Sequence, residues 1–212
     1  VKFSVNGTIV PKPTQVSQTR NLLITGRTLI EAEPRTLHWF SFEVDTKADE
    51  PARFGIFDAF ATDADRAEHL AAGFAQAAVA ATDQLFDRPL EIENVGLLAH
   101  KVVPDGSKEE VGVKFGVRVK FTVKPEHASE ANAVLNRLAS DVAREDGTPY
   151  WFALAWPDNN TFGIFDAFYD EAGRQAHLSG VGAKTFLGAI EGIVSSPPSL
   201  ELVEVLARKN LV

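Results

Sequence analysis

The sequence predicts an α+β fold made of two copies of one unit, each with the element order β-α-β-β-α-β. The main observation is the heptapeptide FGIFDAF, which occurs at Phe54–Phe60 and again at Phe162–Phe168. The flanks of the heptapeptides also match, since Trp39 recurs as Trp151, and the loop between this match and the heptapeptide is four residues longer in the first copy. Matching of this length indicates an internal duplication, and the presence of only two copies favours a pseudo-twofold pair over a solenoid.

The first elements are clearest in the second copy. Apolar and polar residues alternate over Val113–Lys124, which predicts a strand with one buried face that ends at Pro125. Apolar residues at helical spacing then predict a helix over Glu126–Arg144, and an Asp-Gly pair ends it.

The remaining elements of the copy follow in the same way. Tyr150–Trp156 and Thr161–Phe168 are short apolar runs separated by a turn, which predicts a hairpin. A helical pattern runs from Asp170 to about Val194, and glycines near its middle break it in two. Leu200–Arg208 predicts the last strand. The first copy repeats this order more loosely, and the order is that of a ferredoxin-like unit.

The domain organisation follows from the duplication. We expect one ferredoxin-like repeat over residues 1–103 and a second over residues 113–212. The stretch between them, residues 104–112, begins with the polar and turn-rich run PDGSKEE and is predicted to be a linker.

The hairpin strands indicate how the two repeats pack. Trp39–Val44 and Tyr150–Trp156 are apolar on both faces, whereas helices cover only one face of a lone ferredoxin-like sheet. We therefore expect the two sheets to face each other and close an intrachain barrel, which also protects their edges. The alternative is two separate cores without a shared barrel.

Composition excludes several function classes. The net charge of −8 disfavours nucleic acids and anionic membranes as partners. The absence of cysteine excludes disulfides and thiolate chemistry, and it fits a reducing compartment. Neither a signal-peptide pattern nor an apolar run of transmembrane length is present, so we expect a cytoplasmic protein. Histidines never occur at i and i+4, so no metal site is predicted.

The stretches after the two heptapeptides carry a family resemblance. FDAFATDADRAEHLAAG and FDAFYDEAGRQAHLSGVG, together with the preceding TLHWFSFEV and TPYWFALAW, resemble the antibiotic biosynthesis monooxygenase (ABM) family. The resemblance covers essentially the whole chain, twice. It implies a dimeric α+β barrel of ferredoxin-like units, here within one chain. It also implies an oxidoreductase: a cofactor-independent monooxygenase acting on a small aromatic substrate, such as a quinol or a polyketide-like phenol.

Departures from the family pattern leave other functions open. The family often has Trp where this chain has Phe60 and Phe168. Relatives that degrade haem use a Trp in that region and an Asn on the first strand. Asn6 occupies that strand in the first copy, but Arg118 replaces it in the second. Haem degradation is therefore a third interpretation, after the monooxygenase and a non-catalytic barrel that binds a small hydrophobic ligand. Further pairing of two chains into a homodimer is open.

The resemblance places His69 and His177 at the family's histidine position. A neutral imidazole titrates near pH 6.5 and can act as a general base, and small residues one turn away leave room for a ligand. Arg66 and Arg174 lie three residues earlier on the same helix flank and could hold an anionic oxygen. The alternative is a structural histidine beside a solvated arginine.

Two acids and four aromatic side chains complete the candidate site. Asp58 and Asp166 lie within apolar strands, where each would be a proton acceptor or the ion-pair partner of Arg66 or Arg174. An aromatic group could contact substrate or simply fill the core, and its members are Trp39, Trp151, His38 and Tyr150.

Overall fold

The computed structural model describes residues 1–103, 112–157 and 160–211. The first repeat contains, in order, β1 (Phe3–Ile9), α1 (Val16–Glu31), β2 (Thr36–Val44), β3 (Arg53–Phe60), α2 (Asp63–Leu70), α3 (Gly73–Ala80), α4 (Thr82–Leu85) and β4 (Glu91–Val102). The second contains β5 (Phe115–Thr122), α5 (Ala128–Val142), β6 (Tyr150–Trp156), β7 (Thr161–Phe168), α6 (Glu171–Ser179), α7 (Val181–Ile190) and β8 (Ser199–Asn210). Short 3₁₀ turns at Pro13–Gln15 and Pro125–His127 lead into α1 and α5.

The element order agrees with the order that the sequence predicts. The predicted helix after the second hairpin is divided at Gly180, whose extended backbone separates α6 from α7. The helix predicted from Glu126 begins as a 3₁₀ turn because Pro125 lacks the amide hydrogen of a helix interior and is tolerated only in a first turn.

The strands form a closed order. Hydrogen-bonded neighbours run β1-β3-β2-β8-β5-β7-β6-β4 and return to β1, which is a barrel of eight strands. In each repeat the third strand is central: β3 pairs antiparallel with β1 and β2, and β7 with β5 and β6. The predicted α+β barrel of two ferredoxin-like units is therefore confirmed.

Two compact units make up the chain, and they do not coincide with the two repeats. Unit 1 comprises Val1–Val95 and Val203–Val212, and unit 2 comprises Gly96–Leu202. The last half of β4 pairs with β6 in unit 2, and the last half of β8 pairs with β2 in unit 1. Each repeat thus contributes the end of its last strand to the other unit. The predicted linker, apart from Gly112, lies outside the described residues.

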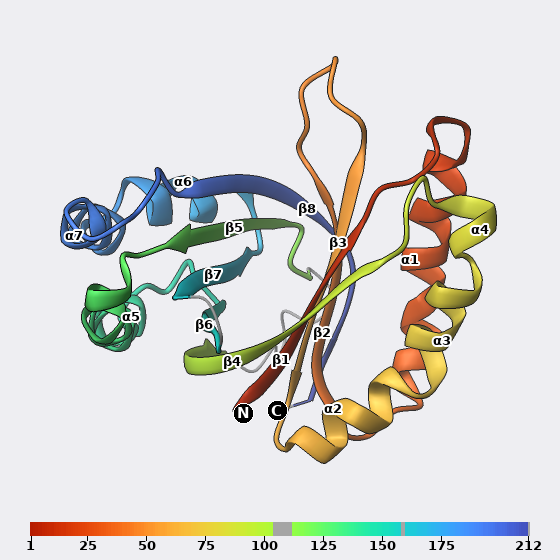
Figure 1. The fold of residues 1–212 in the computed structure, drawn as a ribbon, viewed down its shortest axis with the longest axis horizontal. Coiled ribbons are helices and arrows are strands. Elements are labelled where there is room, and N and C mark those ends of the chain that lie inside the picture. The colour runs from red at the N-terminus through yellow and green to blue at the C-terminus, as the bar shows by residue number, and fades with distance from the viewer. Residues whose placement is uncertain (104–111, 158–159, 212) are drawn as a thin grey trace. The chain divides into compact units, whose positions relative to one another are not determined.

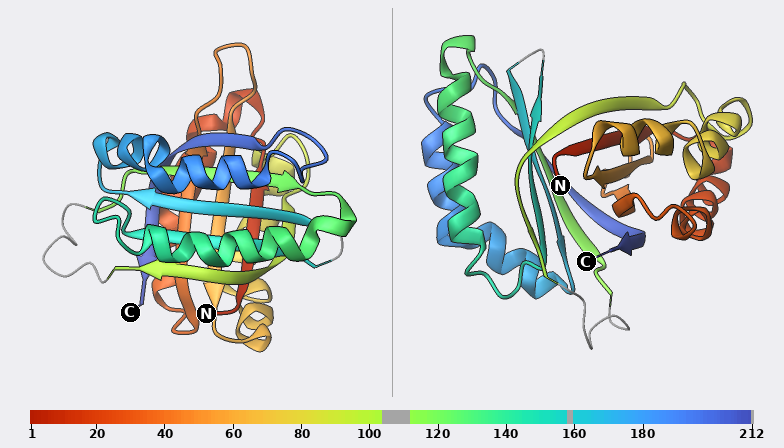
Figure 2. Two further views of the ribbon diagram at one scale, coloured as in Figure 1. Left: turned by 90° about the vertical axis from the view of Figure 1, so that its left-hand side faces the viewer. Right: turned by 90° about the horizontal axis from the view of Figure 1, so that it is seen from below.

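Each unit has its own core between sheet and helices. In unit 1, α1, α3 and α4 lie along one face of the strands (Figure 1), and buried side chains fill the layer between them, among them Leu23, Ile30, Trp39, Phe54, Ile56 and Phe74. In unit 2, α5 and α7 lie side by side over the strands (Figure 2), above Leu135, Leu138, Trp151, Phe162, Ile164 and Phe186. Full burial of one such side chain contributes about 1.5–3 kcal/mol.

Within the described residues, none of the helices combines the length and apolar character that crossing a membrane requires.

Candidate functional site

A buried histidine in unit 1 lies between two carboxylates. His69 is carried by α2, a helix fixed at its start by a reciprocal capping box between Thr62 and Asp65. Its Nδ1 lies 2.7 Å from Glu33 Oε2, and its Nε2 lies 3.5 Å from Asp58 Oδ2. The imidazole is only 5% exposed. We call Glu33, His69 and Asp58 the unit 1 triad.

The same arrangement recurs in unit 2. His177 Nδ1 lies 2.6 Å from Glu145 Oε2, and His177 Nε2 lies 3.4 Å from Asp166 Oδ2. We call Glu145, His177 and Asp166 the unit 2 triad. In both units the imidazole packs at a tilt on the last phenylalanine of the central strand, with ring centroids 5.2 Å apart for Phe60 and 5.4 Å apart for Phe168.

A threonine orients the glutamate of each triad. The Thr36 hydroxyl donates to Glu33 Oε2 over 2.8 Å and lies 3.3 Å from His69 Nδ1. Thr148 makes the same contact with Glu145 over 2.8 Å. Each pair spans the turn between the first helix and second strand of its repeat, so the turn fixes the carboxylate in front of the imidazole.

A lysine closes the end of the helix that precedes each glutamate. Lys209 Nζ donates to the carbonyl oxygen of Ile30 over 2.8 Å and also to that of Glu33. Lys101 Nζ donates to the carbonyl oxygens of Val142 and Glu145 over 3.0 and 2.5 Å. The last carbonyls of a helix lack intrahelical partners and carry partial negative charge, which a buried ammonium group satisfies.

On the side of the small neighbouring residues, where the sequence suggested room for a ligand, each histidine has a glutamate carboxylate. Gly73 has a φ of +53°, and a Cβ at this position would lie 1.9 Å from Glu33 Oε1. In unit 2 a Cβ at Gly182 would lie 3.2 Å from Glu145 Oε1. These glycines therefore admit the glutamates at the first turns of α3 and α7.

The triads change the protonation that an isolated imidazole would have. Burial lowers the pKa of His69 and His177, but the interactions with the two flanking carboxylates outweigh it and raise both pKa values to about 10. Burial raises the pKa of Asp58 and Asp166 in spite of the neighbouring histidine. At neutral pH each histidine is an imidazolium, which differs from the neutral base expected from the sequence.

These pKa values predict a loss of stability at alkaline pH. Because the folded-state pKa of His69 and His177 exceeds the ordinary value of 6.5, their contribution is complete below pH 6.5 and is lost as the pH rises through 10. We expect the free energy of unfolding to fall across this window by up to about 1.4 kcal/mol per pH unit for each histidine. Urea unfolding at several pH values measures the slope, and imidazole NMR signals that titrate near pH 6.5 would contradict it.

A second prediction concerns the glycine that admits Glu33. Gly73→Ala is expected to lower the free energy of unfolding by about 1–3 kcal/mol, because alanine resists a positive φ and its methyl group would displace Glu33. The matched control is Gly188→Ala in α7, where an added Cβ meets no atom within 4 Å. The control should be neutral or stabilising by about 0.4–1 kcal/mol. Thermal unfolding compares the two, and equal effects would contradict the role of Gly73.

Each triad aspartate also faces a tryptophan across the strand pair. Trp39 is the register partner of Asp58, and Trp151 is that of Asp166. Directly opposed residues of an antiparallel pair share one face of the sheet. Trp39 and Trp151 belong to the buried cores of their units, on the helix side of the sheet. The structure therefore brings together the predicted histidine, aspartate and tryptophan of each repeat.

Arg66 and Arg174 pair with acids at the start of their own helices, whereas the sequence analysis weighed an ion pair with the strand aspartates. Arg66 Nη2 lies 2.5 Å from Asp63 Oδ1, and Arg174 Nη2 lies 2.5 Å from Glu171 Oε2. Each guanidinium also lies over the first aromatic ring of its repeat, 5.4 Å from the Phe3 centroid and 5.1 Å from that of Phe115. These acids lie one turn earlier on the same helix as the arginine, and the contacts of Asp58 and Asp166 are with His69 and His177.

His38 and Tyr150 lie apart from the triads. Each precedes a triad-side tryptophan by one residue, so its side chain points to the opposite face of the sheet. His38 Nδ1 lies 2.5 Å from Asn210 Oδ1, its register partner on β8. Tyr150 is fully buried, opposite Ala167.

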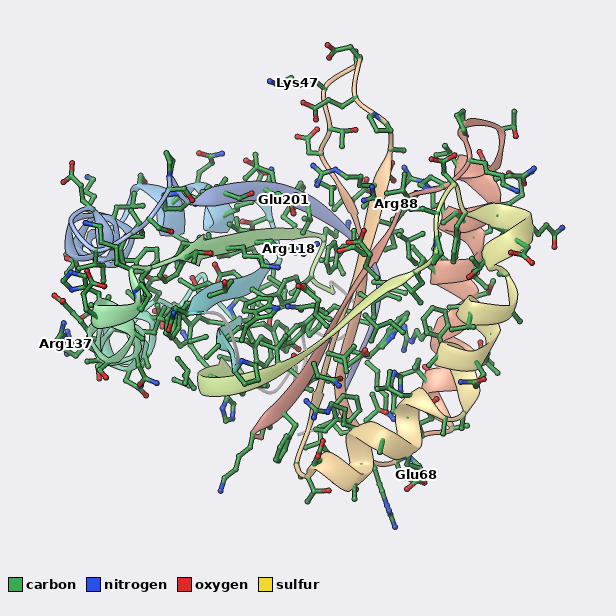
Figure 3. All side chains as sticks on the ribbon, in the orientation of Figure 1. Lys47, Glu68, Arg88, Arg118, Arg137 and Glu201 are labelled. Carbon is green, nitrogen blue, oxygen red and sulfur yellow. The ribbon has the colours of Figure 1, made fainter. Side chains whose placement is uncertain are left out.

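The residues that the haem interpretation would use are also separated from the histidines. Asn6 pairs in register with Phe57, the neighbour of Asp58, and so lies on the sheet face opposite His69. At the corresponding place in unit 2, Arg118 Nη1 lies 3.6 Å from Glu201 Oε2 (Figure 3). Within residues 1–103, 112–157 and 160–211, no group of three or more His, Cys, Asp and Glu side chains is arranged to hold a metal ion.

Comparison with solved structures places the fold. A protein titled "putative monooxygenase" from Fusobacterium nucleatum matches 99% of this chain and 94% of its own with a TM-score of 0.85 and 14% identity. One with the same description from Lactobacillus acidophilus matches 99% of this chain and 95% of its own, with a TM-score of 0.77 and 15% identity. The chain has the fold of these two proteins.

An anthrone oxidase-like protein matches 98% of the chain and 92% of its own, with a TM-score of 0.59 and 12% identity. At identities this low the likeness concerns the fold. No family profile matches the chain. No curated protein sequence matches it either.

Sequence reasoning missed the glutamates, threonines and lysines around the two histidines. The recurrence of such residues in both repeats could have identified them. Glu33 and Thr36 recur as Glu145 and Thr148 at the spacing that relates Trp39 to Trp151. A polar residue kept in both copies beside an apolar strand is a candidate for a buried partner.

Proposed function

We propose that this protein is a cofactor-independent monooxygenase of the ABM type that oxidises a small electron-rich phenol. The observation that carries the proposal is the duplicated triad, in which the Oδ1 atom of each aspartate is buried without a hydrogen-bond partner in the part of the chain that the structure describes. Such an oxygen is an acceptor set in an apolar layer beside a fixed cation. This is an arrangement suited to taking a proton from a substrate hydroxyl.

The roles of the residues follow from the protonation of the triad. The raised pKa of Asp58 and Asp166 makes these carboxylates stronger bases than ordinary ones, while the histidines are already protonated at neutral pH. We therefore assign the base to the aspartate. The imidazolium holds the aspartate and stabilises the phenolate that forms, and the glutamate holds the imidazolium in its orientation.

The proposed reaction needs no external reductant. The phenolate transfers one electron to O2, and the resulting radical pair combines at the carbon para to the oxygen. Loss of water from the peroxide then leaves a para-quinone. The balance is phenol plus O2 to quinone plus H2O. The substrate supplies all four electrons, and one oxygen atom enters the product.

Oxygen uptake with a panel of phenols, including 1-naphthol and anthrone, tests the proposal. Asp58→Asn with Asp166→Asn keeps the shape of the carboxylates and removes the base, so turnover should fall by about 10²–10⁴-fold. His127→Gln is the matched control, because His127 is a partly exposed residue that precedes α5 and pairs with Glu130 in its first turn. Full turnover in the double variant would refute the assigned base.

Binding without turnover is the second candidate function. It is favoured by one observation, that both ring nitrogens of each histidine are occupied by carboxylates. Saturable binding of a phenol with no oxygen uptake would support this function over the oxygenase. A haem titration that gives a shifted Soret band would instead support the haem interpretation.

A further inference from the structure

Each unit contains two buried polar groups that face each other across a strand pair. Trp39 and Asp58 are directly opposed in register, as are Trp151 and Asp166. Opposed side chains of this kind have Cβ atoms about 4.5–5.5 Å apart. All four residues are at most 1% exposed.

The polar atoms of both pairs lack partners among the described residues. The Nε1 atoms of Trp39 and Trp151 and the Oδ1 atoms of Asp58 and Asp166 are buried there without a hydrogen bond. An unmade hydrogen bond on a buried group costs about 1–3 kcal/mol. The same donor and the same acceptor are without a hydrogen bond in both repeats, in the same arrangement. Each repeat is therefore destabilised in the same way.

The chemistry of the two groups defines what would satisfy them. An indole N–H only donates, and an ionised carboxylate only accepts. A hydroxyl can meet both, by donating its proton to the carboxylate and accepting from the indole. An ether or a quinone oxygen can accept from the indole but has no proton for the carboxylate.

We infer that each tryptophan and aspartate pair recognises the free hydroxyl of a bound phenol, which gives the chain two phenol sites. This inference rests on the proposed function and names the group that the site selects. It also predicts an order of affinities: the phenol binds more tightly than its methyl ether or the quinone product. Loss of the hydroxyl proton during the reaction would then favour product release.

Calorimetric titration under nitrogen separates binding from turnover. The probes are 1-naphthol and 1-methoxynaphthalene, which differ at the hydroxyl alone. We expect two naphthol molecules per chain and at least tenfold weaker binding of the ether, because a site built for a hydroxyl rejects analogues that leave its polar groups unpaired.

Variants then assign the two sites. Trp39→Phe should abolish one naphthol site, Trp151→Phe the other, and the double variant both. Trp156→Phe is the matched control, because Trp156 is the third of the three tryptophans and its ring lies under Lys120 Nζ at 4.6 Å. Asp58→Asn tests the unit 1 site independently, should the tryptophan variants fold poorly, and it should also reduce the stoichiometry to one.

Equal binding of the ether, absent naphthol binding, or two sites surviving in the double tryptophan variant would overturn the inference. Its failure is distinguishable from failure of the proposed function. If naphthol binds with the expected pattern but consumes no oxygen in air, hydroxyl recognition stands and the oxygenase proposal falls.

Discussion

Replacing His69 with leucine is expected to lower the free energy of unfolding by about 3–5 kcal/mol, the range for breaking a buried ion pair from one side. The imidazolium separates Glu33 from Asp58, and the charge of Glu33 already contributes to the raised pKa of Asp58. Without the cation, two acids share a poorly solvated space. Leucine fills much of the volume but supplies neither charge nor hydrogen bonds.

Urea unfolding measures this loss, and its pH dependence identifies the cause. If the loss is electrostatic, it should shrink toward acidic pH, where the two acids become neutral. His127→Leu is the control: it removes a partly exposed pair with Glu130, for which about 0–1 kcal/mol is expected. A loss for His69→Leu that stays constant from pH 7 to acidic pH would show that the ring only fills space.

Much of the fold could be predicted because local pattern and tertiary environment agree. The alternation over the strand that became β5, and the helical spacing over α5, follow directly from which face each element buries. The division of β4 and β8 between the units could not be predicted. The alternation of apolar and polar residues indicates which face of a strand is buried, but it does not indicate which strand lies beside it. The pairing of β4 with β6 could therefore not be predicted from this alternation.

Individual residues of the candidate site could be picked out from the sequence, but the contacts between them could not. The repeated heptapeptide and the histidine after it located Asp58 and His69. Their contact depends on how α2 crosses β3, which spacing along the chain does not contain. The sequence favours Arg66 as an ion-pair partner of Asp58, whereas in the structure Arg66 pairs with Asp63 on its own helix.

Glu33 was missed for a different reason. It follows α1 in a charged stretch with Glu31 and Arg35, which is typical of an exposed helix end. The conformation of Gly73 and the hydroxyl of Thr36 turn its carboxylate inward. This missed residue matters for the chemistry, because its carboxylate acts together with that of Asp58 to raise the pKa of His69.

The exchange of strand ends leads to the last prediction, that each lysine acts on the triad of the other repeat. Lys209→Met should disturb the unit 1 triad, because Lys209 satisfies carbonyls at the end of α1 up to Glu33. Lys101→Met should likewise disturb the unit 2 triad through Val142 and Glu145. Hydrogen bonds from a charged group are worth about 1.5–3 kcal/mol, so each variant should lose stability of that order.

Imidazole NMR signals distinguish the two triads, and each variant is the matched control of the other. Lys209 belongs to the second repeat in sequence but to unit 1 in space, so its variant should shift the signals of His69 and leave those of His177 in place. Lys101→Met should do the reverse. If each variant instead shifts the histidine of its own repeat, the strand ends are not exchanged. If both variants shift both histidines, the lysines act through overall stability. Only the crossed pattern fits a chain in which the lysine beside each triad comes from the other repeat.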